Sequence, residues 1–404
     1  MNVIGIIAEY NPFHAGHHIH ISMTRELVGK DCPVIAVMSG GFVQRGDFAI
    51  FNKWARAEAA VMTLGGADLV LEIQTPFANA TAEKFALNGV RMLEACGMVT
   101  HLSFGSEAGE VEPLEKIADY LLSDAFNDHI GEYMTGGTTF AAARQKLADK
   151  DLGNIAEHMK TPNNTLGIEY IKAIKKEMSR MQPVTVRREG SEHDSEYHEH
   201  GIASASKIRS MILGGQAYSA MKFLPEQSIE IAIREISRGT GPISLAMNSF
   251  AIMACLRKLK PEDFEKLPDV GEGLHMRIYN MLKNAGNINE AADIIKTKRY
   301  SHARIRRILM SAYLSITGEA AAMRPQYLRV LAFNDTGRTL LRDMKETSRL
   351  PIITKPADMQ QLDEDGKKLF EIEAVCTDLY SICCPSERYR MAGNDYRYSP
   401  KYLR

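Results

Sequence analysis

The sequence has 404 residues, of which 45% are apolar, so it is too long for one ordinary core and two or three domains are expected. Its charges nearly cancel, with 49 Lys and Arg against 50 Asp and Glu, so any affinity for nucleic acid must come from a local patch of cations. The six cysteines show no CxxC spacing and no apolar run is long enough to cross a membrane, which predicts a reduced, cytoplasmic protein.

The first predicted element is a buried strand, followed by a tight loop and a helix. Residues 3–8 form an unbroken apolar run rich in β-branched side chains, typical of a central strand. Pro12 ends the strand, Gly16 lets the backbone pass close to a ligand, and a helix is expected from His17 onward. Free amides at a helix start attract anions, and His14 and His17 can add donors, so this segment is a candidate phosphate site.

Metal binding or simple burial of the histidines is the alternative, and His18 and His20 keep it open. No Cys lies nearby, and a glycine-containing loop suits phosphate better than a tetrahedral metal shell. We therefore predict no metal site.

Polar residues follow a second buried strand, predicted at residues 33–38. Strand, helix and strand imply a right-handed parallel unit, and open α/β sheets bind ligands beyond the carboxyl ends of such strands. A solvated loop and helix face is the alternative. The candidates for contact with phosphates or a small carboxylate are Gln44, Arg45, Lys53 and Arg56.

Further strands are predicted at residues 69–73, 100–104 and 184–186. Gly105 follows one of them, where a missing Cβ lets adenine or ribose lie against the backbone; a plain turn glycine is the alternative. Arg187 and Arg188 end another strand, and phosphate contact or a salt bridge would account for them. Residues 191–200 contain three histidines among four acidic residues, and we interpret them as a polar loop over the site rather than a zinc site.

Two helix starts complete the first predicted domain. Asn163 and Asn164 follow Pro162, and either side chain could cap the helix that begins there. The segment from Ser204 to Arg209 places small residues, among them Ser206, before the cations Lys207 and Arg209 at a strand-to-helix turn.

The fold class predicted is α/β, with a Rossmann-like parallel-sheet domain over residues 1–215 and a mainly helical domain over residues 216–404. Helices are expected at residues 228–238, 242–260, 261–283 and 288–314, and one more strand at residues 327–333. A basic stretch offers a local field for an RNA backbone, with a solvated helix face as the alternative. Its cations are Lys298, Arg299, Arg304, Arg306 and Arg307. The tail from Arg388 to Arg404 interleaves tyrosines with cations and could stack bases or pack across the domain.

The string from Glu9 to His17, Glu-Tyr-Asn-Pro-Phe-His-Ala-Gly-His, resembles the signature of the HIGH-type nucleotidyltransferase superfamily and, in its full length, that of the tRNA(Met) cytidine acetate ligase family. The SG-x-F-x-QRG stretch at residues 39–46 and the KW-x-R segment at residues 53–56 carry the same resemblance, and residues 203–209 resemble the second superfamily signature. Asn52 stands where the family has an acidic residue and Ser206 where it has Thr, while Ala205 lacks a hydroxyl.

The resemblance implies an ATP-dependent ligase that makes N4-acetylcytidine at the wobble position of elongator tRNA(Met). Acetate would attack the α-phosphorus of ATP and release pyrophosphate, and the cytidine N4 amine would then attack acetyl-adenylate. His14, His17, Lys207 and Arg209 would stabilise charge growing on the phosphates, and Mg²⁺ would accompany ATP.

The resemblance and the residue patterns together predict three sets of contacts. ATP would contact Ile7, Ala8, Glu9, Tyr10, Asn11, Pro12, Phe13, His14, Ala15, Gly16, His17, His18, Ile19, His20, Gly105, Asn163, Arg187, Arg188, Ser204 and Ser206, with Asn164 left as the helix cap. Acetate or tRNA would contact Ser39, Gln44, Arg45 and Lys53, and the five cations of the basic stretch would bind tRNA.

Two other functions remain as alternatives. One is a small-molecule adenylyltransferase, although such enzymes are usually much shorter and the helical domain would be unexplained. The other is a non-catalytic RNA-binding protein that retains a nucleotide site. The residues carry no signal of an oligomeric state.

Overall fold

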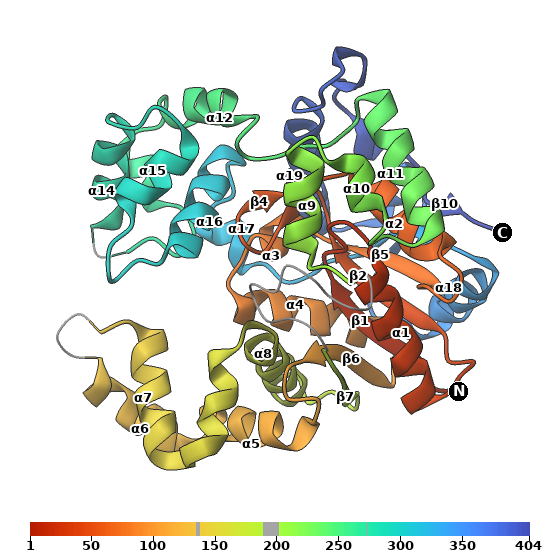
Figure 1. Ribbon diagram of the computed structural model, residues 1–404, viewed down its shortest axis with the longest axis horizontal. Helices are drawn as coiled ribbons and strands as arrows, with labels where there is room; N and C mark the ends of the chain where they lie inside the picture. Colours follow the sequence, from red (N-terminus) through yellow and green to blue (C-terminus); the bar gives the residue numbers. More distant parts are fainter. Residues whose placement is uncertain (135–137, 189–201, 272) are drawn as a thin grey trace.

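The computed structural model describes residues 1–134, 138–188, 202–271 and 273–404. An eight-stranded sheet forms its centre, in the order β10-β8-β5-β2-β1-β6-β7, with β9 paired to β8 (Figure 1). The first five strands in the sequence to join this sheet are β1 (Ile4–Ala8), β2 (Val34–Ser39), β5 (Leu69–Ile73), β6 (His101–Ser106) and β7 (Gln182–Arg187). They pair in parallel with one another, and β1 lies between β2 and β6, which confirms the predicted α/β class and central first strand.

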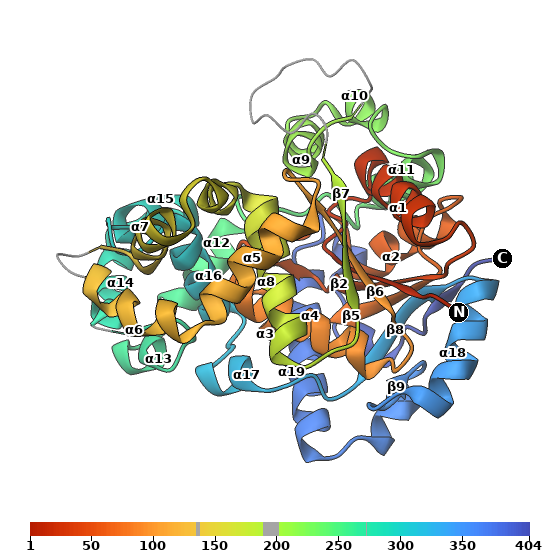
Figure 2. The same ribbon diagram turned by 90° about the horizontal axis from the view of Figure 1, so that it is seen from below.

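Helices cover both faces of the sheet (Figure 2). One face carries α3 (Thr75–Ala78), α4 (Ala82–Ala95), α5 (Val111–Leu122) and α8 (Pro162–Lys176). Beyond them, α6 (Asp124–Tyr133) packs on α5, η1 (Gly153–Lys160) packs on α5 and α8, and α7 (Phe140–Leu152) packs on α6 and η1. The other carries α1 (Ala15–Val28), α2 (Lys53–Met62), α9 (Ala205–Leu213), α10 (Ala217–Met221) and α11 (Glu226–Arg238).

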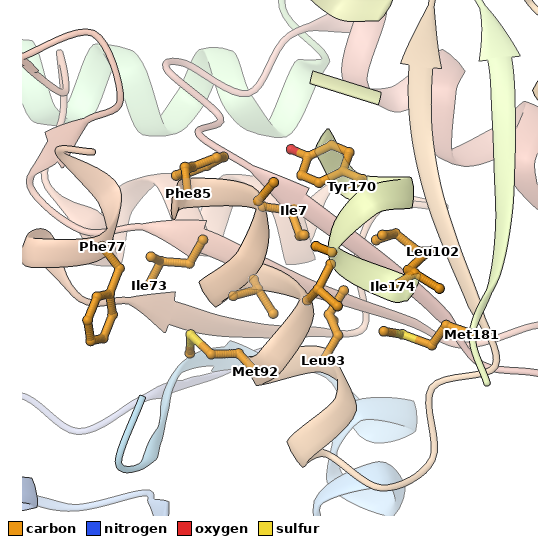
Figure 3. Packing of buried hydrophobic residues seen from close by; sticks show 14 of the residues in the cluster. Ile7, Ile73, Phe77, Phe85, Met92, Leu93, Leu102, Tyr170, Ile174 and Met181 are labelled. Carbon is orange, nitrogen blue, oxygen red and sulfur yellow. The ribbon is translucent and has the colours of Figure 1, made fainter. Parts of the chain in front are cut away.

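The core between the sheet and the helices α4 and α8 is packed closely (Figure 3). Ile7 of β1, Leu93 of α4 and Tyr170 of α8 are all buried there. Glycines allow this approach: a Cβ on Gly89 would lie 2.7 Å from Ile7, and one on Gly167 would lie 2.6 Å from Phe104. Both helices can therefore lie directly on the strands that end at the candidate site.

A helical region follows α11 in the chain. It contains α12 (Ser249–Leu256), α13 (Pro261–Glu265), α14 (Leu274–Leu282), α15 (Ile288–Ile295), α16 (His302–Tyr313) and α17 (Gly318–Ala322). Its core also takes in side chains of a small hairpin, β3 (Phe42–Val43) and β4 (Asp47–Phe48). No helix in the described part of the chain is long and apolar enough to cross a membrane.

The predicted long helices break into shorter ones. The helix expected at residues 288–314 ends at Ile295 and resumes at His302, because Ser301 caps the new helix by accepting a hydrogen bond from the amide of Arg304 (3.3 Å). The basic stretch is therefore divided between a loop and a helix.

The chain then returns to the sheet. The predicted domain boundary at residue 215 does not anticipate this return. β8 (Leu328–Phe333) pairs antiparallel with β5, and β9 (Ile352–Ile353) and β10 (Lys401–Tyr402) pair with β8. The remaining elements are α18 (Asp335–Thr347), η2 (Pro356–Gln361), α19 (Glu364–Ser381), η3 (Glu387–Tyr389) and η4 (Asn394–Tyr396). Residues from about 324 onward thus complete the first domain. This could not be predicted because strand pairing between distant segments leaves no local pattern in a sequence.

A buried cluster of charged side chains joins this returning part of the chain to α2 and β5. Lys53 Nζ lies 2.6 Å from Glu72 of β5 and 2.9 Å from Asp395 of the tail, and Arg329 of β8 lies 3.0 Å from the same aspartate. Glu373 of α19 lies 3.6 Å from Lys53. Lys53, a predicted substrate contact, is only 2% exposed and its ammonium is occupied by these carboxylates, so the structure gives it a structural role.

Burial raises the pKa of Glu373 well above its usual value, with Glu72 adding to the effect and Lys53 opposing it. Lys53 and Arg329 lower the pKa of Asp395 although burial alone would raise it. Burial thus favours the protonated form of Glu373, while Lys53 and Arg329 face the carboxylates of Glu72 and Asp395.

The cluster predicts destabilising effects of very different size for two substitutions. Lys53→Met should destabilise the protein by about 3 to 5 kcal/mol because it leaves buried carboxylates without a partner, whereas Glu373→Gln should cost about 1 kcal/mol or less. Thermal and urea unfolding of both variants measure this. A Lys53→Met variant that is as stable as the parent but inactive would restore the substrate role.

Candidate active site

Two histidines cap the start of α1 and thereby acquire defined tautomers. His14 Nδ1 accepts a hydrogen bond from the amide of Gly16 (3.0 Å), and His17 Nδ1 accepts one from the amide of His14 (3.2 Å). A neutral imidazole whose Nδ1 accepts must carry its proton on Nε2. Both rings therefore offer an Nε2–H donor, and neither donor has a partner among the described residues.

The packing of the aromatic and imidazole rings explains the spacing of the residues in the first signature. The two imidazoles lie with their centroids 3.8 Å apart, and the edge of Tyr10 meets His17 at 5.0 Å. A Cβ on Gly16 would lie 2.8 Å from the ring of His14, so glycine is the residue that lets the ring turn back over the helix start. The loop before it contains a cis peptide bond between Asn11 and Pro12.

Both histidines are neutral at physiological pH. Burial lowers the pKa of His14 to about 3, with Arg188 and Arg209 contributing, and it lowers the pKa of His17 well below its usual value. Burial and Arg188 lower the pKa of His20 to about 4. Positive charge at this site therefore comes from arginine and lysine, while the histidines act as hydrogen-bond donors.

The second signature meets the first at the start of α9. Arg209 donates to the carbonyl of Asn11 (2.8 Å) and to Ser206 Oγ (3.2 Å). Ser204 caps the helix by accepting from the amide of Lys207 (3.2 Å). The Lys207 side chain is exposed and has no ion-pair partner in the part of the chain that the structure describes. Two segments far apart in the sequence thus share one site.

The ends of β6 and β7 provide the opposite wall. A Cβ on Gly105 would lie 3.0 Å from the side chain of Arg188, so the arginine passes over the glycine. Arg187 crosses Gly109 in the same way, since a Cβ on that glycine would lie 2.8 Å from the Cβ of Arg187. Both arginines are exposed at the strand end, as a phosphate contact requires.

Glu107 is a residue of this wall that the sequence reasoning missed. Its carboxylate accepts from Asn163 Nδ2 (2.6 Å) and from the amide of Asn164 (2.8 Å), so it, and not Asn164, satisfies the start of α8. The Asn164 side chain instead accepts from the amides of Glu107 and Ala108 (2.9 and 3.0 Å). Its predicted capping role is therefore wrong. In the sequence, the only indication of this arrangement is that an acidic residue, Glu107, lies shortly after Gly105.

The β3–β4 hairpin borders the site on the side of the helical region. The amide of Gln44 donates to Glu9 (2.9 Å), and its side chain donates to the carbonyl of Ala80 (3.0 Å). Arg45 is exposed at the turn. Arg45 also acts electrostatically on Arg209, which places the two guanidinium groups in one field.

Other predicted contacts have structural roles. His18 Nε2 bonds to the carbonyl of Leu64 (2.9 Å), and His20 Nε2 bonds to Ser103 of β6 (3.0 Å). Arg56 is buried and donates to the carbonyls of Ser39 and Gly40, which joins the exit of β2 to α2. The Ser39 hydroxyl is buried and has no hydrogen-bond partner among the described residues.

Asn52 makes two hydrogen bonds at the start of α2. Its Oδ1 caps α2 by accepting from the amide of Ala55 (2.9 Å). Its Nδ2 donates to Glu235 (2.8 Å), a bond that an aspartate could not make. The change from an acidic residue is thus matched by a carboxylate partner.

The five cations of the basic stretch do not form one open face. Lys298 and Arg299 are exposed. Arg304 donates to the carbonyl of Asp269 (2.6 Å), and Arg306 pairs with Asp47 of the hairpin (2.7 Å). Arg307 is half-buried, and its pKa is lowered by burial against the opposing charge of Asp269. The predicted polar loop at residues 191–200 lies outside the described residues.

A close backbone contact joins the hairpin to the helical region. A Cβ on Gly46 would lie 2.7 Å from the backbone of Arg306 and Arg307, and Gly46 has a φ of 70°. Any larger residue would push α16 away from the turn that carries Arg45.

Comparisons with known proteins agree with this geometry. The family description HIGH Nucleotidyl Transferase matches residues 1–395. The crystal structure of Thermotoga maritima TmcAL bound with alpha-thio ATP covers 100% of both chains with a TM-score of 0.92 and 31% identity. The tRNA(Met) cytidine acetate ligase of Caldanaerobacter subterraneus is 39% identical over 388 residues (95% of each chain), and that of Acetivibrio thermocellus is 36% identical over 411 residues (98% of each).

The fold and the two joined signatures define a nucleotidyltransferase of the HIGH superfamily. Within it, the chain belongs to the tRNA(Met) cytidine acetate ligase family and is a ligase.

The histidine cap predicts that His14→Asn separates structure from chemistry. Asparagine can still accept from the amide of Gly16, and it is a favoured cap, but it lacks the Nε2–H donor. We expect a melting temperature close to that of the parent and a fall in adenylate formation on the order of a hundredfold, as for removal of a transition-state donor. His14→Ala, the matched control, should lose the cap as well, at about 1 kcal/mol.

Pyrophosphate release from ATP and acetate, together with thermal unfolding, checks both effects. Activity of His14→Asn within a few-fold of the parent would refute the donor role. Loss of a stoichiometric metal from the variant would support the metal alternative instead.

The lowered histidine pKa values also predict acid sensitivity. His14 and His20 stay neutral in the folded protein down to about pH 3 and 4, whereas in the unfolded chain they take up protons below about pH 6.5. Stability should therefore fall as pH drops from 6.5, by up to about 1.4 kcal/mol per pH unit for each histidine. Urea midpoints between pH 7.5 and 4.5 measure it, and His14→Asn should show a shallower slope. An equal slope in both proteins would contradict the buried neutral state of His14.

Proposed function

We propose that this chain uses ATP to activate acetate as acetyl-adenylate and then acetylates the N4 amine of the wobble cytidine in elongator tRNA(Met). One observation carries the proposal: Arg209 of the second signature bonds to the carbonyl of Asn11 in the first, beside His14. This contact places cations and neutral donors around the start of a helix that follows a parallel strand, where a triphosphate is expected to bind.

In the first step, an acetate oxygen forms a bond to the α-phosphorus and the bond to the bridging oxygen of pyrophosphate breaks. Arg209 and Lys207 would stabilise the charge that develops on the leaving phosphates, and the Nε2–H groups of His14 and His17 would donate to their oxygens. Neutral histidines suit this task because a buried imidazolium would repel the neighbouring Arg188 and Arg209 before ATP arrives. No covalent protein nucleophile is required.

The second step transfers the acetyl group to RNA. The cytidine N4 attacks the acyl carbon, AMP leaves with the electron pair of the broken acyl–oxygen bond, and the N4 proton is lost to solvent. We place acetate and the cytidine beside Arg45 and Gln44, at the exit of β2, because the predicted contact Ser39 is fully buried. Lys53 does not belong to this group because its ammonium is buried among carboxylates.

The nucleotide would extend from the histidine cap along the ends of β6 and β7. Gly105 and Asn163 would lie against adenosine, and Arg187 and Arg188 would meet phosphate oxygens. Lys298 and Arg299, which are exposed, would contact the tRNA backbone.

Magnesium would enter with ATP as part of the substrate. Among the described residues there is no group of three His, Cys, Asp or Glu side chains placed to hold a metal. The nearby carboxylates of Glu107 and Asp47 already accept hydrogen bonds or an ion pair. Phosphate oxygens and water therefore suit Mg²⁺ better than a protein cage does.

The proposal predicts pyrophosphate release that depends on acetate but does not require tRNA. Incubation with ATP, labelled acetate and total tRNA should then place the label in N4-acetylcytidine, identified by nucleoside analysis. Propionate in place of acetate serves as a control for acyl selectivity. Pyrophosphate release without acetate, into another nucleotide product, would favour a small-molecule adenylyltransferase, and tRNA binding with no pyrophosphate release at all would favour a non-catalytic RNA-binding protein.

A further inference from the structure

A cavity of about 460 Å³ lies at the start of α2, apart from the histidine cap. Its walls come from the start of α2, the end of α11, the end of α19 and the tail that follows α19. In Figure 1 the dark-blue tail stands beside α11 and α2. None of the residues that cap α1 or α9 lines it, so it is distinct from the proposed ATP site.

The lining of this cavity is strongly positive. Glu235 is its only carboxylate among the described residues, against six arginines and lysines. Three of these cations are neutralised: Lys53 by the buried cluster, and Arg234 and Lys401 by Glu58. Arg238, Arg388 and Arg397 are exposed and have no ion-pair partner within the described ranges. Three guanidinium groups thus face one cavity without a counter-charge, an arrangement suited to an anion with several oxygens.

Aromatic rings lie beside these cations. The rings of Trp54 and Tyr398 are in contact with centroids 4.6 Å apart, and Tyr389 lies under the guanidinium of Arg388 at 5.9 Å. Trp54 is 8% exposed, whereas Tyr398 is 49% exposed, so one side of the pair is open to a further ring. Aromatic stacking together with arginine is how proteins hold unpaired nucleotides.

We propose that this cavity is a second nucleotide site, which binds one base against Tyr398 and its phosphate among Arg238, Arg388 and Arg397. The volume falls in the range of pockets that enclose small ligands, and one nucleotide is of that size. A nucleotide of the bound tRNA or a free mononucleotide could supply this chemistry. The tRNA source rests on the proposed function, because that function brings the RNA to this protein.

The sequence provides a direct reporter, because Trp54 is the only tryptophan of the chain. We expect saturating tRNA to quench or shift tryptophan emission, and ATP with acetate to leave it nearly unchanged. Titration with millimolar AMP and CMP tests the free nucleotide as the source.

Two variants test the assignment. In the first, Arg238, Arg388 and Arg397 are each replaced by Gln, and in the matched control Arg342, Lys345 and Lys367, which are exposed outside the cavity, are replaced by Gln. Only the first variant should lose the emission change and bind tRNA more weakly. Removal of each phosphate contact should lower the slope of log K against log salt by about 0.7 to 0.9. Tyr398→Ala should reduce the emission change and affinity without altering the slope.

Each outcome of these experiments supports or overturns a different part of the proposal. No emission change with tRNA or mononucleotides, or a change that persists in the arginine variant, would overturn the proposal. A change with AMP or CMP that the arginine variant loses, combined with unaltered tRNA affinity, assigns the cavity to free nucleotides. Acetate-dependent pyrophosphate release without tRNA, measured on the same proteins, should be equal in all of them. Its absence from the parent would refute the proposed function while leaving the fluorescence result on the cavity intact.

Discussion

Two hydrogen bonds from main-chain amides to imidazole Nδ1 atoms set the chemistry of the site. They fix the start of α1, and they leave His14 and His17 with Nε2–H donors that stay neutral. The same bonds explain Gly16, over which the His14 ring turns. Cations from β7 and α9 then surround neutral donors, so an incoming polyanion meets positive charge without the repulsion that a charged imidazole would add.

Much of this site could be predicted from local sequence. The strand from Val3 to Ala8, the loop with His14 and Gly16, and the second signature at Lys207 and Arg209 are each local patterns, and the structure brings them together. What could not be predicted depends on distant partners. Lys53 has the local pattern of a ligand contact, but its carboxylates come from β5, α19 and the tail. Asn164 has the local pattern of a cap, but the residue that satisfies the helix, Glu107, lies on another element.

The helical region and the catalytic site are mechanically connected. The hairpin that carries Gln44 and Arg45 contributes Phe42 and Phe48 to the core of the helical region, and Asp47 pairs with Arg306 of α16. Arg306 of α16 therefore acts directly on the hairpin. A movement of α16 when RNA binds would reach Arg45 through Gly46, whose backbone lies against that helix.

The antiparallel pairing of β5 with β8 has a consequence for biosynthesis. β5 is fully buried and apolar except for Glu72, yet one of its edges stays unpaired until Leu328–Phe333 leaves the ribosome. At about 5 to 20 residues per second, that wait is on the order of tens of seconds. An open strand edge is a site for wrong pairing during this interval. β1, which precedes the histidine cap, can pair with β2 and β6 much earlier, and β10 can join the sheet only after β8.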